Sequence, residues 1–308
     1  MKAIRLYGPR GSERAVLEQL PIPELGMGEV LVRVHATAVT QGELEWYPTW
    51  HTPKGDPRLN PVPSHEFSGV IDEIAPDVTG LKKGDPVYGL NSWFIDGAAA
   101  EYCMTTPGEI APKPRTIDHF QAAVVPISGL TAWQALFDHG KLETGQKVLI
   151  HGGAGGVGSF AIQLATWKGA FVATTVSAAN AEFVGQLGAK EVIDYRKSKF
   201  EEVVNDADLI VDLIGGSTLQ RSFGAIKKGG RVVTIAASSE STEDPKVKDA
   251  FFIVESNRQQ LVELAKLIDA GTVRPIVSDV LPLEAAAQAY FPIKKNNPGK
   301  TVLQVSSQ

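Results

Sequence analysis

The chain contains a single cysteine, Cys103, among its 308 residues. It can therefore form neither an internal disulfide nor a multi-cysteine zinc site, and we interpret Cys103 as a small buried apolar residue. Long hydrophobic runs are also missing, since no stretch approaches the ~18–20 apolar residues that a membrane helix needs. The first residues, MKAIRLYGPRGSER, lack the apolar core of a secretion signal. These absences predict a soluble cytoplasmic protein.

Clusters of basic residues are absent as well. The formal net charge is −5, and lysine and arginine occur singly or in pairs. Because a nucleic-acid-binding surface shows as a basic patch or stripe, we expect no nucleic-acid partner. Hydrophobic residues make up 43% of the chain and charged residues 21%, which is typical of a globular protein. The length is enough for two domains with substantial cores.

What is present in the first ~120 residues is a pattern of short strands and tight turns. In residues 29–39, EVLVRVHATAV, alternate positions from Val30 to Ala36 are apolar and predict a half-buried strand. Residues 68–89 contain strand-length apolar segments that are interrupted by proline and glycine, as in a barrel-like domain. Helical periodicity begins only after Phe120.

From Gln146 onward, strands alternate with helices. KVLIHG and AFVATTVS read as short buried strands, and the segment between them, SFAIQLATWKG, reads as a helix that stops at Gly169. This alternation continues to about residue 236 and predicts a parallel sheet with helices on both faces. Residues 258–271 form one more amphipathic helix, and the chain closes with a strand that the pattern alone does not place.

The most informative motif is GAGGVG, residues 153–158, which follows a predicted strand and opens a predicted helix. In that setting, Gly153 permits a sharp turn, Gly155 permits close approach of a pyrophosphate, and Gly158 permits close packing of the helix on the strand. Free N–H groups and the positive end of the helix dipole would meet the pyrophosphate charge. We interpret the motif as a dinucleotide-binding loop; the alternative is a glycine-rich turn without a ligand.

The end of the second strand of this unit indicates which dinucleotide binds. Ser177 and Asn180 stand there, with no acid to bind the ribose hydroxyls of NAD and repel a 2′-phosphate. Tyr195 and Arg196, after the third strand, add a hydroxyl and a cation, so the residues favour NADP(H). Two alternatives remain open: Ser177 as a helix N-cap, and Arg196 with Lys197 as a solvated loop.

Three motifs, AAVVPISGLTAWQAL, GQKVLIHGGAGGVGSFAIQLA and GKTVLQV, together resemble the zinc-free quinone reductase branch of the medium-chain dehydrogenase/reductase superfamily. The resemblance runs over essentially the whole chain. It implies an α/β fold in which a Rossmann doubly wound parallel sheet is inserted into a GroES-like, β-rich catalytic domain. The expected boundaries are 1–123 for the GroES-like domain, 124–271 for the Rossmann domain, and 272–308 for a segment that returns to the first domain. The resemblance also implies a homodimer.

The same resemblance implies the cofactor contacts. Those expected near the nicotinamide and its ribose are Thr131, Ala236, Phe252 and Val254, and Lys300 would close over the cofactor. The contacts expected at the phosphates are Gly155, Gly156, Val157 and Gly158 for the pyrophosphate, and Ser177, Asn180 and Tyr195 for the 2′-phosphate. Members of the family often have lysine where this chain has Asn180.

The stretch PVPSHEFSGV, residues 61–70, resembles the segment that supplies a histidine ligand to zinc in alcohol dehydrogenases. A catalytic zinc of that type needs three protein ligands and one open position. By the resemblance, Thr40 and Ile127 stand where the two cysteine ligands would be. We therefore expect no metal site, and we interpret His65 as a hydrogen-bonded loop histidine whose neighbour Glu66 pairs either with it or elsewhere.

Without zinc, the chemistry that remains easy is reduction of an acceptor that is already electrophilic. We expect NADPH-dependent reduction of quinones or related conjugated carbonyls, with Thr40 as first and Tyr47 as second candidate for the hydroxyl donor at the carbonyl. Trp46 and Trp50 would form aromatic walls for a flat acceptor or, alternatively, anchor their loop. The alternative functions are a double-bond reductase for unsaturated aldehydes and ketones, and a non-catalytic NADPH-binding redox sensor.

Overall fold

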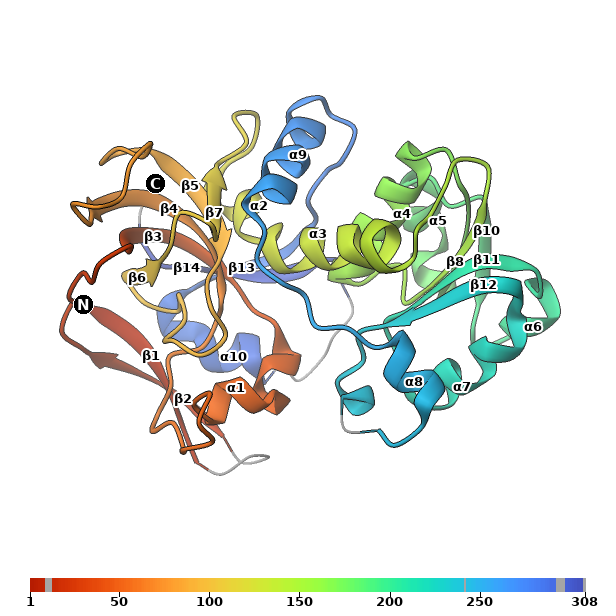
Figure 1. Cartoon of the computed structure of the whole chain (residues 1–308), viewed down its shortest axis with the longest axis horizontal. Coiled ribbons are helices and arrows are strands. Elements are labelled where there is room, and N and C mark those ends of the chain that lie inside the picture. Colours follow the sequence, from red (N-terminus) through yellow and green to blue (C-terminus); the bar gives the residue numbers. More distant parts are fainter. Residues whose placement is uncertain (9–12, 241, 292–296, 307–308) are drawn as a thin grey trace. The chain divides into compact units, whose positions relative to one another are not determined.

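The computed structural model describes residues 1–8, 13–240, 242–291 and 297–306. Its contacts divide the chain into two compact units (Figure 1). The first unit contains Met1–Ile127, Ser256–Gly271 and Pro275–Gln308, and the second contains Ser128–Glu255 and Thr272–Arg274. No helix in the described ranges is long and apolar enough to cross a membrane.

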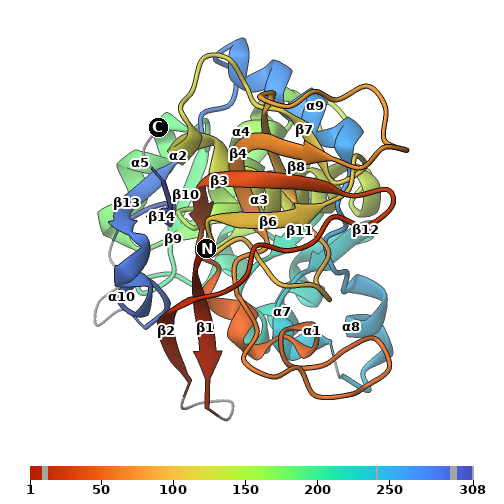
Figure 2. The same cartoon turned by 90° about the vertical axis from the view of Figure 1, so that its left-hand side faces the viewer.

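The first unit is built on a mixed sheet (Figure 2). Its strands follow the order β13-β14-β3-β4-β5-β7, with β6 paired to β3, while β1 and β2 form a separate antiparallel pair. The bounds are β1 Lys2–Tyr7, β2 Arg14–Gln19, β3 Val30–Ala38, β4 Glu66–Ile74, β5 Pro86–Leu90, β6 Tyr102–Thr105, β7 Ile110–Pro112, β13 Val277–Pro282 and β14 Lys300–Gln304. The closing strand β14 pairs antiparallel with β3, Val302 facing Ala38, so the end of the chain returns to the first unit.

Strand β3 is more deeply buried than its alternation predicts. Arg33 is its single exposed residue, so both faces of β3 are covered rather than one. Val30, Val32 and Val34 pack with Phe67 and Cys103 in one core cluster, which confirms the burial expected for Cys103. Ala36 and Ala38, farther along the strand, pack in a second cluster with Ala123 of α2 and Val302 of β14, and it is these later segments that the local pattern does not reveal.

The helices of the first unit are α1 (Tyr47–Trp50), α2 (His119–Ala123), α9 (Arg258–Asp269) and α10 (Ala286–Tyr290). The sequence boundaries grouped residues 258–271 with the nucleotide-binding domain, whereas the contacts of α9 group it with the first unit. The Tyr88 hydroxyl donates to the Leu261 carbonyl over 2.6 Å, and the Arg258 guanidinium donates to the Ile110 carbonyl over 2.5 Å. These contacts join residues far apart in the chain, so helical periodicity does not predict them.

The second unit contains the predicted parallel sheet, in the order β10-β9-β8-β11-β12. Its strands are β8 Lys147–His151, β9 Phe171–Val176, β10 Glu191–Asp194, β11 Ala207–Asp212 and β12 Ile226–Thr234. Its α-helices are α3 Pro126–Trp133, whose first two residues belong to the first unit, α4 Gly156–Trp167, α5 Ala181–Gln186, α6 Phe200–Val203, α7 Gly216–Ala225 and α8 Pro245–Ala250. In Figure 1, α4 and α5 lie on one side of this sheet and α7 and α8 on the other. Gly169 and Gly188 adopt positive φ values of 84° and 112° just beyond α4 and α5, as expected for helix stops.

Candidate functional site

The glycine loop joins β8 to α4, and its three motif glycines differ in what a side chain would meet. A Cβ on Gly153 would lie 2.1 Å from the Thr174 hydroxyl oxygen, and a Cβ on Gly158 would lie 2.3 Å from the Gly152 carbonyl oxygen. The fold itself therefore requires glycine at both positions. A Cβ on Gly155 would meet only the Gly152 carbonyl oxygen, at an ordinary 3.4 Å. Gly155 is exposed, so the surface that its missing side chain leaves free is open to a ligand.

The first turn of α4 provides the polar half of the same site. Gly155 is the N-cap residue, and Gly156, Val157 and Gly158 open a helix of 12 residues. The first N–H groups of a helix have no acceptor one turn earlier, and the helix dipole adds partial positive charge at this end. At this site, a backbone surface that no side chain covers lies beside free N–H donors, and this combination fits the pyrophosphate of a dinucleotide.

The residues expected at the 2′-phosphate end lie at one edge of the sheet. Val176 pairs with Asp194 in register, so Ser177 and Tyr195, which follow them, leave the sheet side by side. Ser177 occupies the N-cap position of the helical turn 178–180, but its side chain makes no capping hydrogen bond to that turn. Tyr195 is 57% exposed, and the Arg196 guanidinium lies 5.6 Å from the centre of its ring.

Residues of this edge also include an acid whose position the sequence interpretation did not weigh. The Asp194 carboxylate accepts a hydrogen bond from the Arg196 backbone N–H over 3.1 Å. Asn180 begins α5 as its N-cap without a side-chain capping bond, and its own N–H donates to the Ser177 carbonyl over 2.9 Å. The edge thus presents hydroxyl, amide and guanidinium groups together with one carboxylate that is already engaged by its own turn.

The residues expected near the nicotinamide are largely buried within the second unit. Thr131 is 3% exposed and lies in α3, while Ala236, Phe252 and Val254 are 7–8% exposed. The Phe252 ring stacks on the His139 imidazole with their centroids 4.3 Å apart. This stacking holds Phe252 against its own unit, so a packing role accounts for the ring as it stands.

Asp212, which the sequence interpretation missed, organises the loops after β11 and β12. Its carboxylate accepts hydrogen bonds from the Thr234 hydroxyl over 2.8 Å and from the Gly215 N–H over 2.9 Å. Asp212 is fully buried, and burial raises the pKa of its carboxyl above the ordinary value, against the effect of those hydrogen bonds. The sequence signal that could have identified Asp212 is an acid at the end of a buried strand, shortly before two glycines.

In the first unit, Lys300, Glu66 and Thr40 form a three-membered polar cluster. The Lys300 ammonium donates to the Thr40 hydroxyl oxygen over 2.6 Å and forms a short ion pair with the Glu66 carboxylate. Thr40 also hydrogen-bonds to Glu66. The second Glu66 oxygen accepts the Ile127 backbone N–H over 2.8 Å. Glu66 therefore pairs with Lys300 rather than with its neighbour His65, which answers a question that the sequence left open.

The electrostatics of this cluster follow from its burial. The Glu66 side chain is fully buried and that of Lys300 is 10% exposed. Burial raises the pKa of Glu66, while the Lys300 charge and the hydrogen bonds from Lys300, Ile127 and Thr40 act against that rise. The resemblance assigned Lys300 to the cofactor, but no sequence signal links Lys300 to Thr40 and Glu66, more than 230 positions earlier in the chain.

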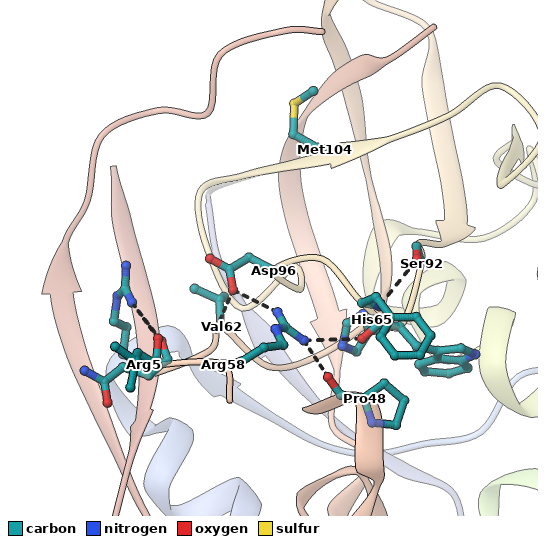
Figure 3. A network of polar contacts seen from close by, with 12 residues as sticks. Arg5, Pro48, Arg58, Val62, His65, Ser92, Asp96 and Met104 are labelled. Atoms are coloured by element: carbon teal, nitrogen blue, oxygen red, sulfur yellow. Dashed lines mark hydrogen bonds and ion pairs between the residues drawn. The ribbon is translucent and has the colours of Figure 1, made fainter. Parts of the chain in front are cut away.

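His65 lies in a separate network, shown in Figure 3. Its Nδ1 lies 3.0 Å from the Asn91 side-chain oxygen, and Trp93 packs edge-on against its ring. The Asn91 amide nitrogen faces two carbonyl oxygens, so the network assigns the proton to His65 Nδ1. Burial, with the nearby Arg58 charge, lowers the pKa of His65 to about 4. The ring is thus a neutral, hydrogen-bonded core histidine.

Arg58 ties the same network together. Its guanidinium donates to the Pro48 carbonyl over 2.8 Å and pairs with Asp96 over 3.1 Å (Figure 3). Asp96 in turn accepts the Val62 N–H over 3.1 Å. Arg58 and Asp96 therefore join the chain segments around His65, which accounts for the network as a structural one.

The donor set at these positions does not fit a catalytic zinc. Thr40 is bonded to Lys300 and Glu66, the Ile127 side chain has no donor atom, and the His65 imidazole faces Asn91. Across the part of the chain that the structure describes, no group of three His, Cys, Asp or Glu side chains is placed to hold a metal. Three protein ligands are what a catalytic zinc requires.

The second catalytic candidate, Tyr47, makes a ring contact with a residue of its own helix region. Tyr47 opens α1, is 49% exposed, and stacks on His51 with ring centroids 4.2 Å apart. Of the two tryptophans, Trp50 donates its indole N–H to the Leu44 carbonyl over 2.8 Å and packs on a core cluster, which matches the anchoring alternative. Trp46 instead packs edge-on against Trp93.

A second buried acid, Glu43, lies one helical turn beyond Thr40. One of its oxygens accepts the Ser64 N–H over 3.0 Å and a short bond from the Tyr290 hydroxyl. Burial is the main reason that the pKa of Glu43 rises to about 7, with the hydrogen bonds acting against it. The sequence interpretation did not single out Glu43 or Tyr290, which lie 247 positions apart.

Comparisons with known proteins agree with this architecture. Residues 26–115 match the family model described as an alcohol dehydrogenase GroES-like domain, and residues 187–303 match the model described as a zinc-binding dehydrogenase. A probable zinc-binding oxidoreductase of Arthroderma benhamiae, named as mitochondrial, is 32% identical, with 92% of this chain and 91% of the relative covered.

Two further relatives are named as quinone oxidoreductases. The protein of Rattus norvegicus is 28% identical, with 98% of this chain and 97% of the relative covered. The solved structure of the quinone oxidoreductase from Coxiella burnetii is 30% identical and superposes with a TM-score of 0.89 over 99% of both chains. Together with the two folded units and the glycine loop, these likenesses show that the chain belongs to the medium-chain dehydrogenase/reductase superfamily, in its quinone oxidoreductase branch, and is an oxidoreductase of that family.

Proposed function

We propose that the chain is an NADPH-dependent oxidoreductase that reduces quinones or related conjugated carbonyl compounds without a catalytic zinc. The observation that carries the proposal is that the chain has a glycine loop shaped for a pyrophosphate, while the side chains of Thr40, His65 and Ile127 do not fit as ligands of a catalytic zinc. NADPH, when bound at that loop, would supply the hydride. Gly155–Gly158 would hold the pyrophosphate, and Ser177, Asn180 and Tyr195 would hold the 2′-phosphate.

The chain's own polar groups are suited to this direction of reaction. When a conjugated acceptor is reduced, the negative charge on its oxygen is delocalised, so a hydrogen-bond donor suffices to stabilise it. Thr40 and Lys300 supply hydroxyl and ammonium groups. Oxidation of a saturated alcohol first requires removal of a proton from an unactivated hydroxyl, which zinc makes easy in metal-dependent enzymes.

An acceptor panel tests the proposed function. With NADPH, we expect turnover of 1,4-benzoquinone, 9,10-phenanthrenequinone or an enal such as 2-hexenal, and negligible oxidation of ethanol or propan-2-ol by NADP⁺. Activity should survive chelation, and elemental analysis should find no stoichiometric zinc. Robust alcohol oxidation without quinone or enal turnover contradicts the proposal. Tight NADPH binding with no turnover of any acceptor identifies a redox sensor instead.

The cofactor preference gives a second test. We expect NADPH to bind more tightly than NADH because Ser177, rather than an acid, follows β9. Ser177→Asp should repel the 2′-phosphate and weaken NADPH binding at least tenfold, about 1.4 kcal/mol, while NADH binding improves or stays constant. Gln186→Glu, an equal change of charge on the exposed face of α5, is the control.

Calorimetric titration with both cofactors measures this preference. Wild-type protein that binds NADH as tightly as NADPH would show that the polar groups at the ends of β9 and β10 do not select the phosphate. A Ser177→Asp variant with unchanged NADPH affinity would place the 2′-phosphate elsewhere.

A further inference from the structure

One of the three N–H donors of Lys300 has no acceptor in the cluster that it forms with Thr40 and Glu66. A lysine ammonium carries three donors. Two of them are directed to the Thr40 hydroxyl and the Glu66 carboxylate, and the structure shows no acceptor for the third within the described residues. The cluster is confined to the first unit and is nearly closed to solvent.

The same contacts limit the ability of the Thr40 hydroxyl to donate a hydrogen bond to an acceptor by itself. Its oxygen accepts from Lys300, and its hydroxyl also bonds to Glu66, so its proton is committed to that carboxylate. Glu66 holds Lys300 in place and balances its charge, and the Ile127 N–H fixes the other Glu66 oxygen. Thr40 and Ile127 are the two positions matched to the cysteine ligands of zinc relatives. The positive charge in this cluster is therefore that of the Lys300 ammonium and not of a metal ion.

We propose that Lys300 is the catalytic residue that stabilises the acceptor's oxygen, with Glu66 and Thr40 as its positioning residues. This inference rests on the proposed function. As the conjugated acceptor gains a hydride at carbon, an electron pair moves to its oxygen, and the third Lys300 N–H meets that charge. The oxygen then takes this proton, and the neutral amine regains a proton from water. The balance is one acceptor, one hydride and one proton, giving the reduced product.

The first experiment uses a probe of the oxygen site that does not depend on turnover. 4-Nitrophenol imitates the oxygen of a reduced acceptor, and its phenolate has its own absorbance. In the complex of wild-type chain with NADP⁺, we expect the pKa of bound 4-nitrophenol to fall by at least one unit, because the ammonium favours the phenolate. Lys300→Met should abolish this fall, whereas Lys54→Met, which removes an exposed lysine of the same unit, should preserve it.

The second experiment separates catalysis from cofactor binding. Lys300→Arg keeps a charge beside Glu66 and is expected to fold, but a guanidinium does not release its proton. We expect this variant to retain NADPH affinity within threefold, by fluorescence titration, and to lose at least tenfold in kcat with a quinone. Thr40→Val should likewise lower kcat about tenfold while leaving NADPH affinity nearly unchanged, since it loosens Lys300.

Two results overturn the inference. If wild-type chain leaves the ionisation of 4-nitrophenol unchanged, the ammonium does not face the oxygen. If Lys300→Arg or Lys300→Met weakens NADPH binding tenfold but keeps kcat at saturating NADPH, Lys300 is a cofactor ligand, as the resemblance implied. A wild-type chain that turns over no quinone or enal defeats the proposed function separately, because the 4-nitrophenol measurement still reports on Lys300.

Discussion

Replacing Gly155 by valine should weaken NADPH binding at least a hundredfold and leave the fold unchanged. Gly155 has a φ of −74°, which any residue adopts, and a Cβ there meets nothing closer than 3.4 Å. The added side chain therefore has room in the free protein, yet it covers the surface that a pyrophosphate must approach. We expect at least a hundredfold rise in the dissociation constant of NADPH, roughly 2.7 kcal/mol, measured by quenching of protein fluorescence.

Two other glycines of the same unit provide the controls. Gly158→Ala should instead lower the melting temperature, because its Cβ would lie 2.3 Å from the Gly152 carbonyl oxygen. Gly185→Ala, within α5, meets nothing within 4 Å and should leave NADPH affinity unchanged and stability equal or higher. A Gly155→Val protein that binds NADPH like the wild type would refute the assignment of the loop. A Gly155→Val protein that unfolds would show that the fold needs this glycine too.

The contrast between these glycines shows what a sequence reveals and where it stops. The spacing of Gly153, Gly155 and Gly158 after a strand predicts a nucleotide loop because each role is local, within a few residues of the backbone. The parallel sheet of the second unit was predicted for the same reason: strand and helix periods are local signals, and the structure confirms them. Which glycine serves packing and which serves the ligand required the positions of Thr174 and Gly152.

The polar cluster of the first unit required long-range contacts that no local pattern contains. Glu66 was noticed beside His65, but its partner Lys300 lies 234 positions later, and the strand pairing of β14 with β3 brings them together. The contact of buried Glu43 with Tyr290 likewise joins residues 247 positions apart. Thr40 and Lys300 were named by resemblance as hydroxyl donor and cofactor contact; their mutual hydrogen bond changes what each is free to do. Both assignments stay predictions until the variants are measured.

Acidification should destabilise the second unit by roughly 3 kcal/mol between pH 6.5 and pH 4. His151 is fully buried at the end of β8, and burial, aided by the Arg221 charge, lowers its pKa from 6.5 to about 4. The Ser222 hydroxyl donates to the Thr218 carbonyl over 2.7 Å. Its oxygen therefore accepts the His151 Nε2 proton over 3.1 Å, and Nδ1 accepts from Thr175. A neutral ring satisfies every partner, and a charged ring does not.

The sign follows from where the protons bind. Between pH 6.5 and about 4, the unfolded state holds a proton on His151 that the folded state lacks, so stability is full above pH 6.5 and falls as the pH falls. The separation of the two pKa values sets the size of the loss at roughly 3 kcal/mol. Asp212, whose pKa burial raises above its ordinary value, opposes the loss toward the acidic end of that window.

In the first unit, the groups with shifted pKa values act in opposite directions as the pH falls. Burial is the main reason that the pKa values of His65 and His119 are lowered to about 4. Both histidines therefore destabilise the folded state as the pH falls from 6.5. Glu43, whose folded pKa of about 7 exceeds its ordinary 4.5, takes up a proton in the folded state first. It therefore adds stability as the pH falls from 7 to 4.5, and this gain offsets about half of the loss from the two histidines.

Urea unfolding at a series of pH values, followed by circular dichroism, measures the free energy of unfolding. One variant in each unit then tests the contribution of its titrating group. His151→Gln, which keeps an amide donor for Ser222, should remove most of the acid-induced loss in the second unit. Glu43→Gln should have the opposite effect in the first unit, making its stability fall more steeply below pH 7, because the compensating proton uptake is gone. If His151→Gln loses stability on acidification as the wild type does, then His151 is not the group that titrates, and the acid sensitivity belongs to another buried group.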